Sequence, residues 1–129
     1  MFRIEPFSRK PVYEQIVEQT ETLVLTGSLT PGDQMPSVRT LAVTLSINPN
    51  TIQKAYIELD RRGIIQAAPG KGNFISPDAY KRLCETKRDQ LDAFDNLVRE
   101  LTLAGVGQDE LCERIKTLAA TSLKGECDQ

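Results

Sequence analysis

Histidine and tryptophan are absent from the 129 residues, and cysteine occurs only 3 times. The missing histidine removes the commonest general base and metal ligand of enzymes, together with the usual catalytic triads. Cys84, Cys112 and Cys127 are too widely spaced for a metal cluster and too few for a secreted disulfide framework. The sequence therefore predicts reduced thiols, no metal, no cofactor and a protein that is not an enzyme.

Long apolar runs are also lacking. No run approaches the roughly 20 apolar residues that a membrane-spanning helix needs, and residues 1–6 lack the apolar core of a signal peptide. We therefore expect a cytoplasmic protein without a membrane partner. The length suits one domain, or a small domain with an appendage.

Excess positive charge is missing too, since the formal net charge is -2. Taken over the whole chain, this argues against a nucleic-acid partner. The charge is unevenly distributed, however. Residues 1–76 carry 8 Lys and Arg against 7 Asp and Glu, whereas residues 77–129 carry 8 against 11. The front part is close to neutral, so a local positive patch there remains compatible with DNA.

The N-terminal part shows one strand signal and one helix signal. Residues 3–5 predict a short strand that Pro6 ends. A helix follows, and Gly27 is placed to end it because glycine readily adopts a positive φ. The apolar positions that define the buried face of this helix are Tyr13, Ile16, Val17, Thr20, Leu23 and Val24.

Two short amphipathic helices with a tight turn at residues 46–48 come next. The pattern predicts Ser37 as the N-cap of the first helix, and Asn48 with Pro49 as the start of the second. Such a helix-turn-helix lets its second helix enter the major groove of DNA. Each helix has one apolar stripe at i, i+3, i+4 and i+7, formed by Val38, Leu41, Ala42 and Leu45 and by Ile52, Ala55, Tyr56 and Leu59.

Residues 64–67 and 73–75 read as paired strands around a Pro-Gly-Lys-Gly tip at residues 69–72. A hairpin directly after two helices predicts a wing, which can reach neighbouring phosphates or the minor groove. The fold class expected is mainly α with a small β-hairpin wing, a winged helix-turn-helix domain followed by a C-terminal two-helix dimerisation tail.

Several polar side chains fall outside the apolar stripes. Arg39 places a cation in the first turn of its helix, against the helix dipole, and a phosphate would remove this conflict. Asn50 and Gln53 can bond adenine edges, and Lys54 can bond guanine or phosphate. The alternatives are a solvated arginine at position 39, and capping or solvated side chains at the start of the second helix.

Residues 77–129 show no strand-like alternation. Their apolar positions predict two amphipathic helices joined by a turn at Gly105 and Gly107. Such a pair cannot bury its apolar face alone at this size, and packing across a two-fold axis is a natural solution. The alternative is a helical hairpin folded back on its own winged domain. The candidate dimerisation residues are Leu83, Leu91, Phe94, Val98, Leu101, Leu111, Ile115 and Leu118.

These motifs resemble the winged-helix domain of the GntR family. The resemblance covers about residues 8 to 76, and the short tail with Asn-Pro-Asn-Thr at residues 48–51 is most similar to the YtrA-type subfamily. One departure is that many relatives carry arginine where Pro49 and Gln53 stand. The runs that carry the resemblance are PGDQMPSVRTLA at residues 31–42, INPNTIQKAY at 47–56 and GKGNFI at 70–75.

The resemblance implies a dimeric bacterial transcription regulator, usually a repressor and often of transporter genes. Residues 1–76 are then the DNA-binding domain and residues 77–129 the dimerisation region. The partners expected are an operator in double-stranded DNA and a second copy of the chain. Two alternatives stay open, a protein-interaction module and a regulator with a ligand pocket between tail and winged domain. The candidate DNA-binding residues are Ser37, Arg39, Asn48, Asn50, Thr51, Gln53, Lys54, Gly70 and Lys71.

Overall fold

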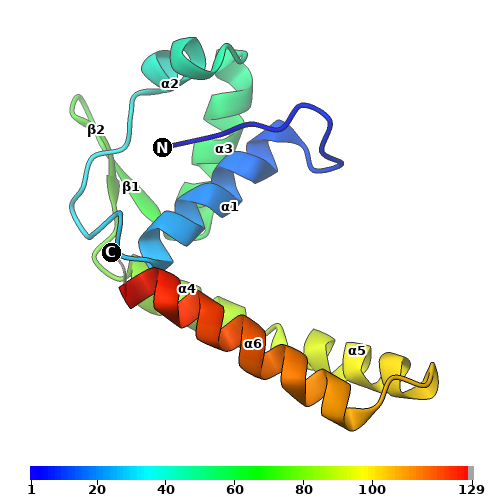
Figure 1. Cartoon of the computed structure of the whole chain (residues 1–129). Coiled ribbons are helices and arrows are strands. Elements are labelled where there is room, and N and C mark those ends of the chain that lie inside the picture. Colours follow the sequence, from blue (N-terminus) through cyan, green and yellow to red (C-terminus); the bar gives the residue numbers. More distant parts are fainter. Residues whose placement is uncertain (128–129) are drawn as a thin grey trace. The chain divides into compact units, whose positions relative to one another are not determined.

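The computed structural model describes residues 1–127, and the side chains of residues 1–122. The chain forms two compact units, Met1–Glu85 and Thr86–Gln129. The first unit holds the predicted winged helix-turn-helix (Figure 1). Its elements are α1 (Val12–Leu25), α2 (Val38–Leu45), α3 (Pro49–Arg61), β1 (Ile65–Ala68), β2 (Gly72–Ile75) and the start of α4 (Ala79–Arg88).

The segment before α1 is not a strand, so the strand predicted at residues 3–5 is wrong. Side-chain amides of α1 form hydrogen bonds with the backbone of this segment, as a neighbouring strand would have done. Gln15 accepts a hydrogen bond from the N–H of Glu5 at 2.9 Å and donates to the carbonyl of Lys10 at 3.0 Å. Gln19 accepts from the N–H of Arg3 at 2.8 Å. These glutamines satisfy the backbone groups without a sheet.

The predicted helix-turn-helix is confirmed by its caps. The Ser37 hydroxyl accepts from the N–H of Thr40, and the Asn48 side chain accepts from the N–H of Asn50. Between the helices, Ser46 adopts a left-handed conformation with φ 55°. Its N–H and that of Ile47 bond the carbonyls of Val43 and Ala42. This is the Schellman arrangement that ends a helix and turns the chain sharply.

The predicted wing is an antiparallel hairpin in which Ile65 pairs with Ile75 and Ala68 with Gly72. A third segment, residues 33–35, lies along its outer edge. Met35 donates to the carbonyl of Asn73, and Ile75 donates to that of Asp33, both at 2.8 Å. The wing is therefore anchored to the connection between α1 and α2.

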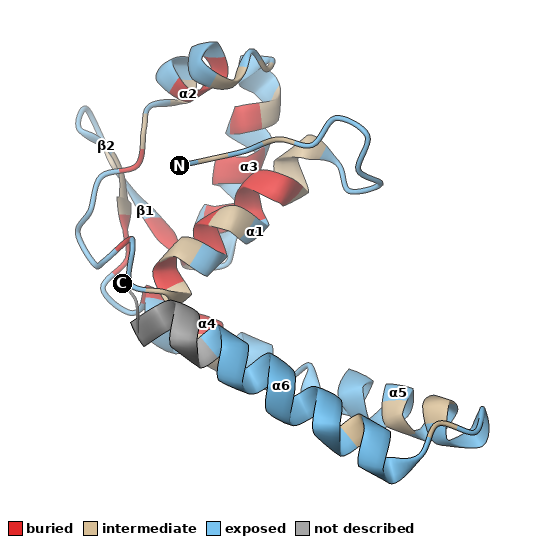
Figure 2. Cartoon of the chain, viewed as in Figure 1, coloured by how far each residue is buried: buried red, intermediate tan, exposed pale blue. Residues whose placement is uncertain are grey.

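The core of the first unit collects the apolar faces of α1, α2 and α3, which Figure 2 shows as buried. All four stripe residues of α3 are buried, as the helical spacing predicts. α1 and α3 form the largest helix–helix contact. The fold class is confirmed as mainly helical with a hairpin wing.

α4 extends this core beyond the wing. Ala79 and Leu83 belong to the buried cluster of the first unit. Leu83, one of the candidate dimerisation residues, is only 1% exposed within this single chain. The apolar spacing predicted an amphipathic helix here, but it did not predict that this helix packs into the core of the first unit.

The second unit contains α5 (Leu91–Leu103) and α6 (Gln108–Cys127). The first predicted tail helix is interrupted, since α4 ends at Arg88 and α5 begins at Leu91. In between, Asp89 and Gln90 make i→i−3 hydrogen bonds to Thr86 and Lys87. The predicted glycine turn is present, with Gly105 at φ 92°. Across the described residues, no helix is long and apolar enough to cross a membrane.

Ser76 yields a stability prediction. Its side chain is 1% exposed, and its hydroxyl has no hydrogen-bond partner among the described residues. An unsatisfied buried hydroxyl costs about 1–3 kcal/mol. We therefore expect Ser76→Ala to leave the free energy of unfolding unchanged or to raise it, as measured by urea unfolding. Ser37→Ala is the matched control, and loss of its cap should cost about 1 kcal/mol. A Ser76→Ala variant that loses as much as the control would contradict this assignment.

Candidate nucleic-acid interface

The outward face of α3 is set by the burial of its opposite face. Ile52, Ala55, Tyr56 and Leu59 are all buried. Asn50 precedes this stripe, and Gln53 and Lys54 lie within it. All three point away from the core and are exposed. They lie in the first two turns of α3, the part of a recognition helix that meets base edges. Amide groups at this position can pair bidentately with adenine.

Asn48 and Thr51 are less available than these three residues for contacts with DNA. The Asn48 side-chain oxygen accepts from the Asn50 N–H at 2.8 Å, so this oxygen serves as the helix cap. Its amide NH₂ remains able to donate to a phosphate or a base. Thr51 is half-buried.

The N-terminus of α2 presents an exposed cation and a hydroxyl pair. Arg39 is exposed and makes no ion pair with any residue in the described part of the chain. The Ser37 hydroxyl accepts from the Thr40 N–H at 3.0 Å and donates to the Thr40 hydroxyl at 2.8 Å. The Ser37 hydroxyl therefore already donates its hydrogen bond within the cap. The Thr40 hydroxyl, which sequence reasoning missed, keeps a proton that it can donate to a phosphate.

Lys54 is held against α1. Its ammonium lies 4.1 Å from the centroid of the Tyr13 ring. A cation over an aromatic ring gains about 0.5–1 kcal/mol at an exposed site. The contact limits the directions in which Lys54 can extend while leaving its N–H groups free to donate. Tyr13 was predicted only as part of a buried face, and the sequence contained no signal for this contact.

The wing tip carries the third group of candidate residues. Gly70 and Lys71 are both exposed, and Gly70 has φ 77°. The Lys71 N–H donates to the carbonyl of Ala68 at 2.9 Å, which closes the turn. Figure 1 shows the wing tip, α2 and the first turn of α3 at the upper end of the first unit.

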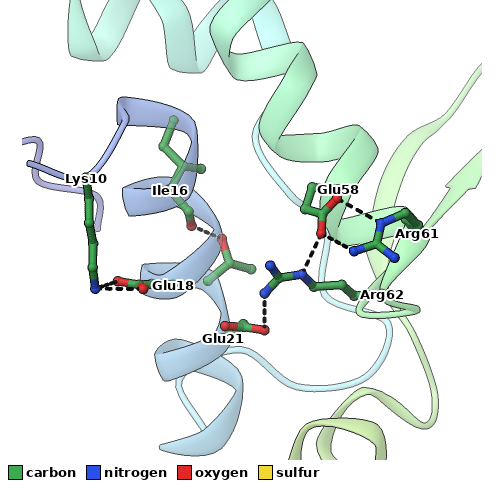
Figure 3. A network of polar contacts seen from close by, with 8 residues as sticks. Lys10, Ile16, Glu18, Glu21, Glu58, Arg61 and Arg62 are labelled. Carbon is green, nitrogen blue, oxygen red and sulfur yellow. Dashed lines mark hydrogen bonds and ion pairs between the residues drawn. The ribbon is translucent and has the colours of Figure 1, made fainter. Parts of the chain in front are cut away.

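Two other arginines are engaged in an ion-pair network at the far end of α3 (Figure 3). Glu58 bonds both Arg61 and Arg62, and Arg62 also pairs with the buried Glu21 of α1 at 3.0 Å. The hydrogen bonds from Arg61 and Arg62 lower the pKa of Glu58 to about 2. These pairs neutralise the C-terminal end of α3 and tie it to α1.

A single hydroxyl links α3 to the segment that precedes α2. The buried Tyr56 side chain donates from its hydroxyl to the Pro36 carbonyl at 2.6 Å. Burial raises the pKa of Tyr56 to about 12, so the proton is retained at neutral pH. Pro36 directly precedes the α2 cap. The recognition helix and the start of α2 are therefore held in a fixed relation.

Seven of the predicted dimerisation residues remain accessible in the second unit. Phe94 is 45% exposed and Leu118 65% exposed, although both are large and apolar. α5 buries none of its residues within the described chain. The seven residues are Leu91, Phe94, Val98, Leu101, Leu111, Ile115 and Leu118, of which Val98, Leu101 and Leu111 are half-buried.

The described residues do not bring three or more His, Cys, Asp or Glu side chains together at a possible metal site. Cys84 is half-buried on α4, whereas Cys112 is exposed on α6. The groups assembled at the start of α2, the start of α3 and the wing tip are cations, amides and hydroxyls. Such groups bind phosphates and base edges.

The family model described as "Bacterial regulatory proteins, gntR family" matches residues 12–75. The HTH-type transcriptional repressor YtrA of Bacillus subtilis (strain 168) is 43% identical over 121 residues, which cover 93% of each chain. The solved structure of a GntR family transcriptional regulator from Listeria monocytogenes is 34% identical, with a TM-score of 0.71 over 85% of this chain and 96% of that chain.

A third comparison concerns a protein bound to DNA. The DNA-binding domain of AraR, in a crystal structure with its operator ORX1, is 26% identical to this chain. The TM-score is 0.51, over 59% of this chain and 93% of that domain. The similarity therefore involves a little more than half of this chain.

The network around Glu58 predicts a pH-dependent contribution to stability. Because the folded pKa is about 2, against an ordinary value of 4.5, the stabilisation is complete above about pH 5 and is lost as pH falls through 4.5 towards 2. At pH 7, Glu58→Gln should lower the free energy of unfolding by about 0.5–1 kcal/mol. Urea unfolding from pH 7 to pH 3 measures this difference. Glu113→Gln on α6 is the matched control, and a gap for Glu58→Gln that stays constant to pH 3 would contradict the network.

Proposed function

The chain belongs to the GntR family of bacterial regulatory proteins, within its YtrA-like subfamily, and from this membership we propose that it acts as a homodimeric repressor at a pseudo-palindromic operator. As a family member it is a DNA-binding transcriptional regulator and not an enzyme. A relative with 43% identity over 93% of both chains is a repressor, so we set aside the protein-interaction module.

One observation carries the proposal about the site. The buried stripe of α3 leaves Asn50, Gln53 and Lys54 exposed in the first two turns of the helix. These three side chains read base edges in the major groove. The DNA-binding domain of AraR, which is similar over 59% of this chain, was solved with a bound operator, and this supports operator DNA as the partner of this chain.

Phosphate contacts position the domain on the duplex. Arg39 and Lys71 supply cations, and the exposed Thr40 hydroxyl donates beside the Ser37 cap. Asn48 donates from its amide, and the Gly70 backbone approaches the DNA closely because it lacks a side chain. Base contacts and phosphate contacts thus come from different elements, which separates specificity from affinity.

Dimerisation is assigned to the region of residues 77–129, and DNA binding to residues 1–76. The seven accessible apolar residues of α5 and α6 form the contact between two copies, and Leu83 is omitted because it is buried. Two recognition helices then enter successive major grooves about one helical turn apart. The family resemblance supports transporter-type genes as targets and a cytoplasmic site of action, where the operator is found.

The division between phosphate and base contacts is testable by a pair of substitutions. Duplexes selected by the wild-type protein from a random 30-base-pair library provide the operator. Arg39→Ala should weaken binding to all duplexes, by about tenfold at moderate salt, and reduce the slope of log affinity against log salt by about 1 for each subunit. Gln53→Ala should instead change which duplexes are selected, at a cost of about 1–3 kcal/mol for the original sequence.

Fluorescence anisotropy at several salt concentrations measures both effects. Arg114→Ala, which removes a cation from α6 in the second unit, is the matched control and should bind like the wild type. The residue roles are wrong if Arg39→Ala and Gln53→Ala both bind the selected duplex like the wild type. Failure of the library to enrich any sequence would contradict operator binding itself.

A charge on the apolar face of α5 should separate the two subunits. Phe94→Glu places a carboxylate on this face, and burying it in a dimer is unfavourable. We expect sedimentation to show a monomer that binds the selected duplex at least tenfold more weakly. Asn96→Glu adds the same charge at a different exposed position of α5 and should remain dimeric. A wild-type protein that sediments as a monomer would overturn the proposed dimer.

A further inference from the structure

We propose that Gln34 is the positioning residue of the wing, which holds Lys71 in place for its phosphate contact. The proposal rests on the proposed function, since it concerns how one of the proposed phosphate contacts is oriented. Gln34 lies in the connection between α1 and α2, 37 residues before Lys71 in the sequence.

The central contact is a hydrogen bond to the backbone of the wing tip. The Gln34 side-chain amide donates to the carbonyl of Lys71 at 2.9 Å. The N–H of Lys71 already donates to Ala68 at the same distance. Both backbone polar groups of Lys71 are therefore bonded, one within the hairpin and one from outside it. The side chain of Lys71 extends from a backbone that is fixed on both sides.

Gly72 makes room for this contact. A Cβ built on Gly72 would lie 3.0 Å from the Gln34 amide nitrogen, which is closer than most Cβ atoms approach another side chain. Gly72 also has φ 114°, where a side chain is strained. The glycine after Lys71 thus lets the hairpin turn and also lets the amide of Gln34 reach the carbonyl.

The backbone around Gln34 is itself fixed. Its neighbours Asp33 and Met35 are bonded to Ile75 and Asn73 of β2 at 2.8 Å. Gln34 itself forms a bridge with Phe74. The exposed glutamine side chain therefore extends from a hydrogen-bonded segment of backbone to the wing tip.

The same segment also reaches the other two elements of the interface. Pro36 accepts the hydrogen bond of Tyr56 from α3 at 2.6 Å, and Ser37 caps α2. Residues 33–37 consequently connect the wing, the recognition helix and the start of α2. Gln34 is the member of this segment that extends the connection to the apex of the wing.

Such a brace has a clear physical role. A two-stranded hairpin with four residues in each strand is marginally stable alone. An unbraced tip would have to be ordered when DNA binds, and that ordering would reduce affinity. By fixing the Lys71 backbone beforehand, Gln34 improves binding without touching the DNA.

The experiment is a double-mutant cycle with the full chain and the duplex selected by the wild type. Gln34→Ala should raise Kd about fivefold for each subunit of the bound dimer, because a hydrogen bond of this kind contributes about 1 kcal/mol. Lys71→Ala, which keeps its backbone carbonyl, should raise Kd by a similar factor. Because Gln34 acts through Lys71, the double variant should bind like Lys71→Ala alone. A double variant whose Kd rises by the product of the two single effects, about 25-fold for each subunit, would overturn the proposal.

Two further variants test whether the donated hydrogen bond of Gln34 is what matters. Gln34→Glu keeps the length of the side chain but cannot donate at neutral pH, and it should weaken binding at least as much as Gln34→Ala. Gln66→Ala removes an exposed glutamine from β1 and should leave Kd unchanged. Thermal unfolding is measured for every variant. Loss of one hydrogen bond lowers the midpoint of a unit of this size by about 4–8 °C. A Gln34→Ala midpoint more than about 12 °C below the wild type would make Gln34 a folding residue and overturn the proposal.

The outcomes also separate this inference from the proposed function. If Lys71→Ala weakens binding and Gln34→Ala does not, Gln34 is not a positioning residue, and the operator proposal is unaffected. Lys71→Ala binding unchanged would remove both the phosphate role of Lys71 and the role of Gln34. No enriched duplex for the wild type would contradict the proposed function and this inference together.

Discussion

The constraint on which the interface depends is the burial of one face of α3. Ile52, Ala55 and Leu59 are each 0% exposed, and Tyr56 is 3% exposed. Because helical side chains lie in fixed directions around the axis, burying this stripe determines which residues face outward. Asn50, Gln53 and Lys54 are exposed because they lie on the opposite side of the helix from this stripe. The Tyr56 hydroxyl adds a directional bond to Pro36, which fixes α3 relative to α2.

A chain with net charge -2 still has exposed cations at the start of α2, at the start of α3 and at the wing tip, namely Arg39, Lys54 and Lys71. Arg61 and Arg62 are bonded to Glu58 and Glu21, so these charges offset one another away from the start of α3. Arg39 and Lys71 have no ion pair with the described residues, and Lys54 is held by an aromatic ring. The distribution of charge therefore matters more than its sum, because screening limits each charge to its surroundings.

The sequence predicted the features that local chemistry determines. The caps at Ser37 and Asn48, the two apolar stripes and the hairpin all depend on residues within a few positions of one another. The sequence did not predict features that depend on residues far apart in the chain. Glutamine side chains of α1 bond the backbone of residues 3–5, where a strand was predicted, and Leu83 packs into the core of the first unit. Residues 86–90 end a helix without proline or glycine. The braces from Tyr56 and Gln34 span 20 and 37 residues, and no spacing pattern predicts such contacts.

The most direct test of the central claim is an NMR titration of the ¹⁵N-labelled full chain with the selected duplex. We expect the largest shifts at the backbone amides of Arg39 and Thr40, of residues 50–54 and of Gly70 and Lys71. The amides of Arg61 and Arg62 should change little. Shifts concentrated on Glu58 to Arg62 or on α5 and α6, with residues 50–54 unchanged, would contradict binding through the exposed face of α3.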